Sequence, residues 1–425
     1  MLVADQLTNS FVYCGLPCIW TGSKYILFDP ANLKMCAFDG KEKMASKETE
    51  DKLKKIGFGL NPQPLPSLSQ EKHVTLILTT DCNLGCPHCY ANSKVSTLFM
   101  EPATAISILE SQIPEKSEVN LQYFGGEPTL NFECLKATYE FAKERFSKLF
   151  AYITTNGVME QTVLDYLIKN RFGFYLSVDG NKQFHDECRF MKNTGEGTFD
   201  KVMNTLRQLV DNDIAVKVRA TISQKNVKNM VEFSETMFDK GVRLIHFAPL
   251  TSVGRGKNFS QETMTAFQDE FVASLEKVFD LARTRGARVM SPATMAIGKS
   301  MAPYCKIFFS ENKILITPEG KRTLCFGTQD EYNPIANQFI CADFDNKTRS
   351  FVTRNDNRQL IAEQYQRNLR QCDNCFARYM CQGGCLVENL SLTGNMTTRS
   401  ELWCLMQKKI WHAAIMRIYT ANGGN

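Results

Sequence analysis

Strand-like and helix-like segments alternate from residue 74 to residue 285, and this alternation constrains the fold more than any other feature of the sequence. Each of six segments has the apolar and β-branched pattern of a strand and is followed by a segment with helical spacing. Strict alternation implies a parallel sheet with the helices outside it. Six units are too few for a closed eight-stranded barrel, so we expect an α/β fold with a partial (β/α)6 barrel.

The expected strands of the barrel are residues 74–80, 119–126, 150–157, 172–180, 216–223 and 243–250. The expected helices are residues 102–112, 132–147, 162–170, 199–210, 227–240 and 262–285.

Two regions of different character flank the barrel segment. Residues 1–70 contain three strand-like stretches, a charged helix over 41–56 and a proline-rich linker over 61–70, which predicts a small α+β domain. After residue 300 the alternation stops and cysteines become dense, so we expect this region to be held by metal as much as by a hydrophobic core. Its residues 314–325 predict a hairpin that turns at Pro318-Glu319-Gly320. The predicted domains are residues 1–70, the barrel 71–286, a bridging segment 287–304 and the cysteine-rich domain 305–425.

Composition excludes several classes of protein. The chain has 50 basic and 45 acidic side chains in 425 residues, a net charge of +5 that is too small and too evenly spread to indicate a nucleic-acid partner. No stretch reaches the roughly 18 to 20 apolar residues of a membrane span, and the N-terminus has no signal-peptide pattern, so we expect a cytoplasmic protein. In that compartment, 16 cysteines indicate metal or cluster ligation rather than structural disulfides.

Three cysteines with CxxxCxxC spacing, Cys82, Cys86 and Cys89, follow the first barrel strand. In β–α folds the loops at the carboxyl ends of the strands carry the chemistry. Three thiolates can hold three irons of a [4Fe–4S] cluster and leave the fourth iron open, which is the arrangement of a catalytic metal site. The alternative is a closed zinc site with His88 or a distant cysteine as fourth ligand.

The segment CNLGCPHCY, residues 82–90, resembles the signature of the radical S-adenosylmethionine (radical SAM) enzymes. The resemblance implies that S-adenosylmethionine chelates the open iron, and that one electron from the cluster releases a 5′-deoxyadenosyl radical, which takes a hydrogen atom from the substrate. In such enzymes the cofactors carry the difficult chemistry, while the protein orients them and excludes water.

Further segments at strand ends are similar to the cofactor-binding motifs of that family. Gly125-Gly126-Glu127 resembles the motif that holds the methionine amino group, whereas the segments around Asn156, Ser177 and Asp179 correspond to the nucleoside and carboxylate side. Taken alone, the segments 155–157 and 177–180, which contain these residues, are ordinary turn sequences. The remaining candidates are Tyr90 for the adenine and Lys201 and Arg219 for the carboxylate, each with an alternative as a core aromatic or a surface charge.

A segment after the fourth expected strand also resembles the family. It contains His185-Asp186 with Arg189, and then Gly197-Thr198-Phe199. For these residues we favour helix capping and ion pairing over catalysis.

Seven cysteines with one glycine in register resemble the SPASM extension of radical enzymes that modify peptides; they are Cys305, Cys325, Cys372, Cys375, Cys381, Cys385 and Cys404. The resemblance implies two auxiliary [4Fe–4S] clusters, so that the enzyme holds three. By the family pattern Cys372, Cys375, Cys381 and Cys404 hold one. Cys305, Cys325 and Cys385 hold the other, with Cys341 or an open iron in the fourth position. The alternative is a pair of structural zinc sites.

The predicted function is that of an oxidoreductase that installs a thioether or carbon–carbon crosslink on a precursor peptide. The alternative enzyme is an anaerobic sulfatase-maturing enzyme, which makes formylglycine. In those relatives an aspartate follows the second cysteine of the run, whereas here Phe326 follows Cys325. An alternative of another class is a zinc or iron–sulfur scaffold without activity.

The resemblance also implies partners. A leader peptide is expected to bind residues 1–70, which loosely resemble the winged-helix recognition element of ribosomal-peptide maturases, by adding a strand to a sheet edge. A flavodoxin or ferredoxin is expected to supply the electron. We expect neither nucleic acid nor a membrane as a partner.

Overall fold

The computed structural model of the 425-residue chain describes residues 4–30, 32–44, 46–58, 71–91, 97–260, 262–263, 266–291, 305, 307, 310–354, 356–381 and 383–422. The predicted linker 61–70 and most of the predicted bridging segment 287–304 lie outside these residues.

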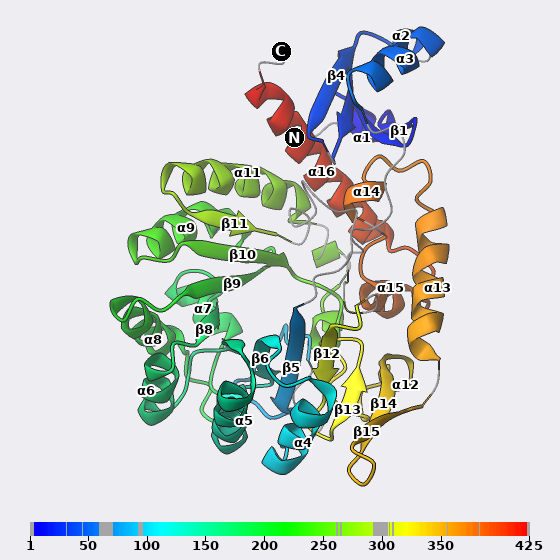
Figure 1. The fold of residues 1–425 in the computed structure, drawn as a ribbon. Helices are drawn as coiled ribbons and strands as arrows, with labels where there is room; N and C mark the ends of the chain where they lie inside the picture. The colour runs from blue at the N-terminus through cyan, green and yellow to red at the C-terminus, as the bar shows by residue number, and fades with distance from the viewer. Residues whose placement is uncertain are drawn as a thin grey trace.

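One eleven-stranded sheet, in the order β11-β10-β9-β8-β7-β6-β5-β12-β13-β14-β15, forms the centre of the molecule (Figure 1). Neighbouring strands from β11 to β12 are parallel, whereas β12 to β15 pair antiparallel. The six predicted barrel strands are β5 (Lys72–Thr79), β6 (Glu118–Gly125), β7 (Lys148–Thr155), β8 (Gly173–Ser177), β9 (Val216–Ile222) and β10 (Leu244–Pro249). The partial barrel is therefore confirmed, and β11 (Arg288–Met290) adds a seventh parallel strand beside β10.

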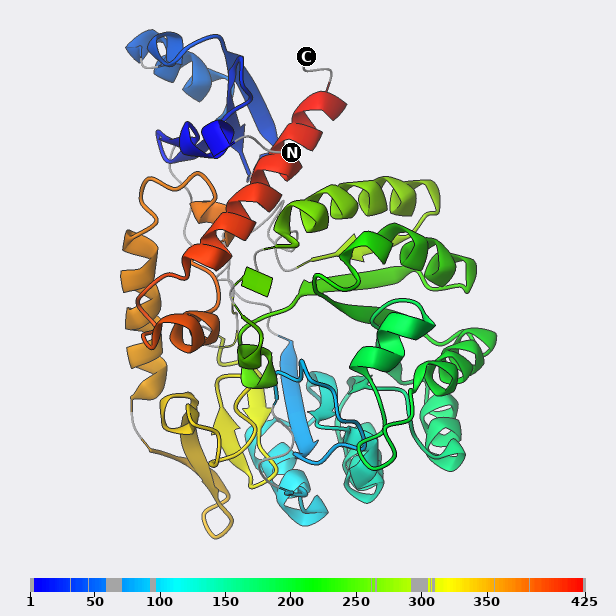
Figure 2. The ribbon, with the colours of Figure 1, turned by 180° about the vertical axis from the view of Figure 1, so that it is seen from behind.

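Helices cover the outer face of the parallel strands (Figures 1 and 2). They are α4 (Pro102–Gln112), α5 (Phe132–Arg145), α6 (Gln161–Lys169), α7 (Lys182–Cys188), α8 (Phe199–Asp211), α9 (Met230–Asp239) and α11 (Gln268–Thr284), with the 3-10 turns η1 (Pro128–Asn131), η2 (Val227–Asn229) and η3 (Gly254–Asn258). Alternate strand residues such as Leu176, Val218 and Ile245 pack under these helices in one core. Because side chains alternate along a strand, their neighbours Ser177, Arg219 and His246 face the inside of the barrel.

The N-terminal unit is a four-stranded antiparallel sheet with three short helices. Its elements are α1 (Ala4–Thr8), β1 (Phe11–Tyr13), β2 (Leu16–Trp20), β3 (Tyr25–Asp29), β4 (Lys34–Phe38), α2 (Lys41–Met44) and α3 (Lys47–Lys55). One face of the sheet packs on α2 and α3 through residues such as Leu27 and Leu53. Residues of the other face, including Ile26 and Phe28, join the large core that contains Trp411 of the C-terminal helix. This unit is therefore anchored to the rest of the molecule.

The C-terminal unit continues the central sheet. The predicted hairpin is confirmed as β12 (Lys313–Ile316) and β13 (Lys321–Thr323), with Gly320 at φ +79° in the turn. The sheet then runs on through β14 (Ile340–Asp345) and β15 (Ser350–Thr353), and the helices are α12 (Ala336–Phe339), α13 (Asn357–Arg370), α14 (Arg378–Cys381), α15 (Leu386–Thr393) and α16 (Glu401–Ala421). Since β12 pairs in parallel with β5, the cysteine-rich unit shares one sheet with the barrel.

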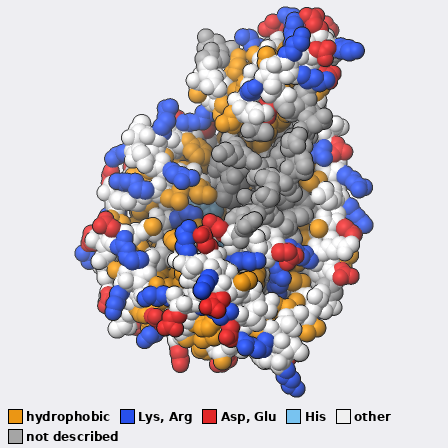
Figure 3. All heavy atoms as spheres, in the orientation of Figure 1, with side chains coloured by type: hydrophobic (Ala, Val, Ile, Leu, Met, Phe, Trp, Pro, Cys, Tyr) orange, Lys and Arg blue, Asp and Glu red, His pale blue; other side chains and the backbone are white. Residues whose placement is uncertain are grey.

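Three expected elements differ from the structure. One of the three strand-like stretches expected in the N-terminal region, residues 18–29, forms parts of the two strands β2 and β3, because the chain reverses at Gly22, whose φ of +99° suits glycine. The charged helix expected over 41–56 consists of the separate helices α2 and α3. The helix expected over 262–285 is not continuous: Glu262 and Thr263 are helical, a turn follows at 266–267, and α11 begins at Gln268. On the face shown in Figure 3, acidic and basic side chains are interspersed, in keeping with the small net charge.

Candidate functional site

The CxxxCxxC loop follows β5 at the carboxyl end of the barrel, as predicted. The loops after β6, β7 and β8, which carry the other predicted motifs, open at the same end because these strands are parallel. Cys82 and Cys86 are buried, and Cys89 is half-buried beside them in one small cluster with Leu84 and Met191. Burial raises the pKa of Cys86 to about 11, although Arg189 acts in the opposite direction. Such thiols become good ligands only when a positive centre compensates their charge.

Asn156 fastens the cysteine loop to the end of β7. Its Nδ2 donates to Asn83 Oδ1 at 2.7 Å and to Cys82 Sγ at 3.7 Å. Asn83 Nδ2 in turn donates to the carbonyl of Val158 at 2.9 Å. The TNG segment is therefore more than a turn, since it fixes the first cysteine of the loop.

The GGEP segment packs against the backbone that leads into the cysteine loop. A Cβ at Gly125 would lie 2.3 Å from the carbonyl oxygen of Thr79, and one at Gly126 would lie 2.1 Å from that of Asp81. No side chain fits at either distance. In this structure the two glycines thus allow a close approach between two backbone segments.

The Glu127 carboxylate is completely buried and links the loops after β6 and β7. It accepts hydrogen bonds from Thr129 Oγ1 at 2.7 Å, from Thr155 Oγ1 at 2.8 Å and from the backbone N–H of Asn156 at 2.8 Å. Burial raises its pKa even though these donors favour the ionised form. These bonds give Glu127 a positioning role at the cysteine loop.

Asp179 connects three elements around the cysteine loop. Its carboxylate accepts from Arg189 Nε at 2.7 Å, from the Thr221 N–H at 2.7 Å, and lies 3.2 Å from His88 Nε2. Burial alone would raise the pKa of Asp179, but the Arg189 guanidinium and His88 hold it well below its usual range. Because His88 lies between Cys86 and Cys89, Asp179 orients the loop from the β8 side.

The segment from His185 to Phe199 has the capping and ion-pair roles favoured above. Asp186 Oδ1 accepts from the Phe199 N–H at 2.7 Å at the start of α8. His185 is buried, and its Nε2 lies 3.1 Å from Thr198 Oγ1. Burial lowers the pKa of His185 to about 4, so its imidazole is neutral at pH 7. Arg189 forms the ion pair with Asp179 described above.

Of the three remaining cofactor candidates, two contact each other and one lies elsewhere. The guanidinium of Arg219 lies 5.7 Å from the ring centre of Tyr90, and in register Arg219 is the cross-strand neighbour of Ser177. Lys201 instead forms an ion pair with Glu196 at 2.8 Å, and its side chain is 45 % exposed. This ion pair is what the surface-charge alternative describes, and the assignment of Lys201 to the cofactor carboxylate stays a prediction. A sequence cannot show which way α8 is turned.

Arg255, which no sequence motif indicated, contacts the cysteine loop from the segment after β10. Its Nε donates to the carbonyl of Cys86 and its backbone N–H to the carbonyl of Cys89, both at 2.8 Å. A Cβ on the preceding Gly254 would meet the Tyr90 carbonyl oxygen at 2.2 Å. The Arg255 Nη1 is buried and has no hydrogen-bond partner in the part of the chain that the structure describes. It is a donor available to a group bound in the loop.

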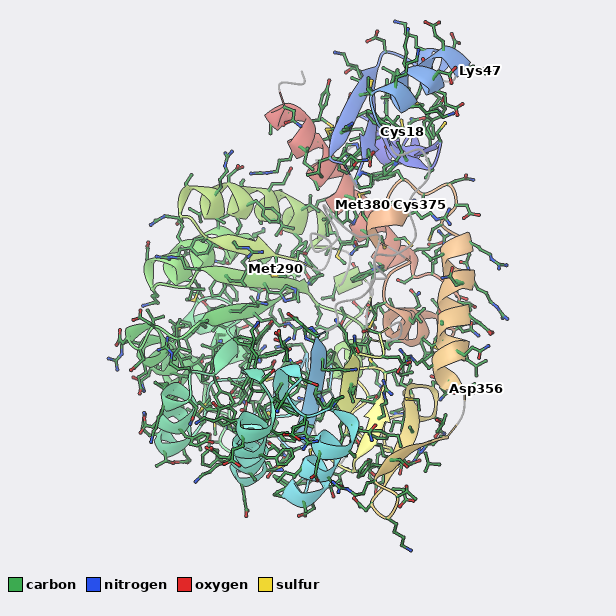
Figure 4. All side chains as sticks on the ribbon, viewed as in Figure 1. Cys18, Lys47, Met290, Asp356, Cys375 and Met380 are labelled. Atoms are coloured by element: carbon green, nitrogen blue, oxygen red, sulfur yellow. The ribbon has the colours of Figure 1, made fainter. Side chains whose placement is uncertain are left out.

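The four cysteines assigned to one auxiliary cluster line a single cavity between α13, α14 and α16; they are Cys372, Cys375, Cys381 and Cys404. Figure 4 shows Cys375 and Met380 in this region beside α16. Three cations, Arg378, Arg399 and Lys408, line the same cavity. Among the described residues, Asn389 Nδ2 and Gln407 Nε2, which also belong to its lining, are buried without hydrogen-bond acceptors.

The lining of this cavity suits an anionic iron–sulfur cluster. Thiolates supply the ligands, cations balance their charge, and amide N–H groups can donate to cluster sulfur. Over the described ranges, no three His, Cys, Asp or Glu side chains converge on a point as ligands of a single metal ion would. The four cysteines surround a volume instead.

The second auxiliary set, Cys305, Cys325 and Cys385, packs against one apolar cluster. Burial raises the pKa of Cys325 to about 12, and the neighbouring Cys305 contributes in the same direction. Cys341 packs in the same apolar cluster, but its Sγ donates to the carbonyl of Arg322 at 3.5 Å. The thiol of Cys341 is thus engaged in the β13–β14 ladder.

A buried polar contact that sequence reasoning missed joins this set to the barrel. Both carboxylate oxygens of Glu388 accept from the Ser252 N–H, at 2.9 and 3.0 Å. Ser252 stands just before Gly254 and Arg255, so the segment after β10 contacts both cysteine regions. No described helix combines the length and the apolar character that a membrane crossing requires.

Comparison with protein families gives one match that agrees with this site. Residues 76–237 match the family described as the radical SAM superfamily. The matched segment contains the cysteine loop and the strand ends from β5 to β9.

Characterised relatives have related sequences. The chain is 28 % identical over 220 residues to the Fe-coproporphyrin III synthase of Methanosarcina barkeri, which covers 49 % of this chain and 53 % of the synthase. It is 26 % identical over 217 residues to the subtilosin biosynthesis protein AlbA of Bacillus subtilis, which covers 49 % of this chain and 45 % of AlbA. These alignments thus span about half the length of the relatives. A cysteine-type anaerobic sulfatase-maturating enzyme of Clostridium novyi is 23 % identical over 332 residues, covering 72 % and 85 %.

Two solved structures share the fold. The anSMEcpe enzyme with bound AdoMet and a peptide superposes with a TM-score of 0.66 at 17 % identity, over 83 % of this chain and 98 % of that one. Streptococcus suis SuiB bound to precursor peptide SuiA gives 0.51 at 14 % identity, over 92 % and 99 %. At these identities the superpositions establish the architecture. Over residues 76–237, which carry the cysteine loop, the chain is similar to the radical SAM superfamily.

Proposed function

We propose that the chain is a radical SAM peptide maturase, which abstracts a hydrogen atom from a precursor peptide and installs a thioether or carbon–carbon crosslink. The observation that carries the proposal is that residues next to two incomplete cysteine sets lie close together. Tyr90, next to the first set, packs close to Gly327 of the second, and the segment Ser252–Arg255 contacts both. In this proposal, the electron that the substrate loses after hydrogen abstraction passes to a cluster held by the second cysteine set.

In this proposal Cys82, Cys86 and Cys89 hold the catalytic cluster, and bound S-adenosylmethionine supplies the hydrogen-abstracting radical. Asn156 and Glu127 fix the loop. The backbone of Gly125 and Gly126 meets the methionine end, while Tyr90, Ser177 and Arg219 line the inner side for the nucleoside and the carboxylate. Asp179 acts through His88 and Arg189, because its oxygens are already used by protein donors.

A peptide substrate is supported by what the relatives do. AlbA is described as acting in subtilosin biosynthesis, and SuiB and anSMEcpe were solved with peptides bound. The crosslink is favoured over formylglycine because the residue after Cys325 is Phe326, whose ring packs on Phe124 with centroids 5.1 Å apart. No carboxylate stands at the place of the base that sulfatase maturation uses.

The cofactor part of the proposal is tested by composition and turnover. Protein reconstituted without oxygen is expected to hold about twelve irons per chain and no zinc. After dithionite reduction it should form 5′-deoxyadenosine, whereas a variant with alanine at Cys82, Cys86 and Cys89 should not. Cys134→Ala, at a buried thiol inside α5, is the matched control. Zinc in place of iron, or no 5′-deoxyadenosine from fully loaded protein, would refute this proposal.

The substrate part requires the precursor peptide. Co-expression with a short peptide encoded beside the gene should yield a product lighter by about two hydrogens per crosslink. Serine oxidation to formylglycine gives the same mass change, so fragmentation must show two joined residues. An unlinked residue with an aldehyde would assign the chain to the sulfatase-maturing activity instead.

We also propose that the leader of the precursor binds residues 1–70 at an edge of the sheet, along β1 or β4. Deleting this unit would disturb the core that it shares with α16. Hydrogen exchange is the better test. Addition of the leader should slow exchange of amides in β1 or β4, and unchanged exchange in both strands would contradict the assignment.

A further inference from the structure

A cavity of about 390 Å³ opens at the amino-terminal ends of β7 to β10, at the opposite end of the barrel from the cysteine loop. Its lining consists of Phe150, Tyr152, Gly173, Phe174, Tyr175, Val210, Ile214, Ala215, Val216, Lys217, Gly241, Arg243 and Leu244. The volume is that of a small-ligand site. None of these residues has a role in the cofactor site described above.

One wall of the cavity is aromatic. Phe150 stacks on Tyr152 with ring centres 5.7 Å apart, and Tyr152 lies 5.3 Å from Tyr175. A Cβ at Gly173 would stand 3.1 Å from Phe150 Cζ, so a larger residue there would crowd this wall. Phe150 is 51 % exposed at the mouth of the cavity. An exposed aromatic at a cavity mouth offers a contact surface to apolar parts of a ligand.

The polar part of the lining is positively charged. Lys217 Nζ donates to Tyr175 Oη at 2.8 Å and lies 4.0 Å from the centre of that ring. Arg243 Nη1 donates to the backbone carbonyls of Phe238 and Val242. Neither cation has an ion pair with a described carboxylate, and the lining contains no Asp or Glu. Lys217 is half-buried and Arg243 is exposed. A half-buried cation without a carboxylate partner favours an anion beside it, so the cavity is complementary to an anionic group.

A row of polar side chains leads from this cavity toward the cysteine loop. On β9, Lys217, Arg219 and Thr221 face the inside of the barrel in succession, and His246 lies beside Arg219 on β10. His246 Nε2 is buried and lacks a hydrogen-bond partner in the described ranges. Thr221 contacts Asp179, which holds His88 of the loop. Thr221 lies four positions along the strand from Lys217, a rise of roughly 13 Å.

We propose that this aromatic and basic cavity binds a carboxylate of the substrate peptide, next to an apolar or aromatic side chain, and so selects peptides with an acidic group. The inference rests on the proposed peptide substrate and specifies it. The carboxylate belongs to an Asp or Glu side chain or to the peptide's C-terminus.

Binding of defined probes to the reconstituted holoenzyme tests the proposal. The probes are fluorescent peptide amides Gly-Ala-Leu-X-Tyr-Ala-Leu-Gly with X as Glu, Gln or Lys, and the Gln peptide with a free C-terminal carboxylate. Fluorescence anisotropy should give a Kd at least tenfold lower for the Glu probe than for the Gln amide, because a charge-assisted hydrogen bond distinguishes them. Equally tight binding of the free-acid Gln peptide would identify the C-terminus as the source of the carboxylate.

Variants of Lys217 test whether the preference for the Glu probe arises from the cavity. Lys217→Met should abolish the preference for Glu, and Lys217→Glu should reverse it toward the Lys probe. Lys169→Met, at an exposed lysine of α6, should change neither Kd. Equal Kd values for all probes on the wild-type protein, or no binding up to millimolar concentration, would overturn the inference without use of any variant. Iron content and 5′-deoxyadenosine formation, measured on the same samples, separate this failure from failure of the proposed function.

Discussion

Replacing Asp179 with asparagine should strongly destabilise the barrel, although the two side chains have nearly the same shape. The change removes the negative charge that pairs with Arg189 at 2.7 Å in a site where Asp179 is 1 % exposed. An asparagine oxygen can still accept from the Thr221 N–H, but its NH2 group cannot accept from the guanidinium. Arg189 would therefore be left buried without compensation.

The expected magnitude follows from this geometry. Two unit charges 2.7 Å apart interact by about 6 kcal/mol at an effective dielectric constant near 20, and part of this offsets their desolvation. Breaking one partner of a buried pair costs about 3–5 kcal/mol in other proteins. For a unit the size of this barrel, each kcal/mol shifts the melting temperature by about 2–4 °C. We therefore expect a decrease in Tm of roughly 6–20 °C.

Circular dichroism melting of the cluster-free protein at pH 7 provides the assay, because it does not depend on the metal content. The matched control is Asp200→Asn, which removes a nearby ion pair with Lys182 whose side chains are 77 % and 57 % exposed. Exposed pairs contribute at most about 1 kcal/mol. If Asp179→Asn melts within about 2 °C of the wild type, or no lower than the control, the central role given to Asp179 is wrong.

Three further predictions concern the cysteine loop and the buried histidines. Gly126→Ala should lower the number of irons bound per chain, because the new Cβ has no room beside the loop backbone. The control Gly40→Ala, where the new Cβ has open space, should not lower the iron content. Equal iron content in the two variants would contradict this prediction. Burial lowers the pKa of His185 to about 4 and that of His246 to about 3, so each favours the neutral form in the folded state. The contribution of the neutral histidines to the free energy of unfolding is then complete above pH 6.5 and falls as the pH drops, by roughly 2 kcal/mol per histidine from pH 7 to pH 5. In urea titrations, His246→Gln should remove the part of this pH dependence that is due to His246. An unchanged pH dependence would refute the assignment. Arg255→Gln should change the electron paramagnetic resonance spectrum or the reduction potential of the cluster, and identical values would show that the guanidinium does not reach it.

The sequence predicted the barrel because its information there is local. Each strand and helix has its own periodicity, and parallel order follows from alternation, so the six strands and the hairpin at Gly320 needed no knowledge of distant contacts. The grouping of Cys372, Cys375, Cys381 and Cys404 came from their spacing and a family resemblance. What could not be predicted depends on residues far apart in the chain. Examples are the Asp179–His88 contact and the parallel pairing of β12 with β5.

The orientation of individual residues was the other property that could not be predicted from the sequence. Lys201 is a cation near a motif, but only the turn of α8 shows that it points to solvent. Arg255 belongs to no motif, and its role becomes visible only when Gly254 is seen against the Tyr90 backbone. For the same reason, Gly126 suggested contact with a ligand, whereas the nearest atoms belong to the protein backbone.

Helix α16 connects the cysteine-rich unit with the N-terminal unit. Its first turn carries Cys404, which lines the cavity with Cys372, Cys375 and Cys381. His412, two turns later, donates to the Trp20 carbonyl of the N-terminal sheet at 2.9 Å. Eight residues of helix span about 12 Å, so a change at one end reaches the other through a single rigid element. A metal cluster held at the first turn of α16 would therefore be coupled through this helix to the packing of the N-terminal sheet at Trp20.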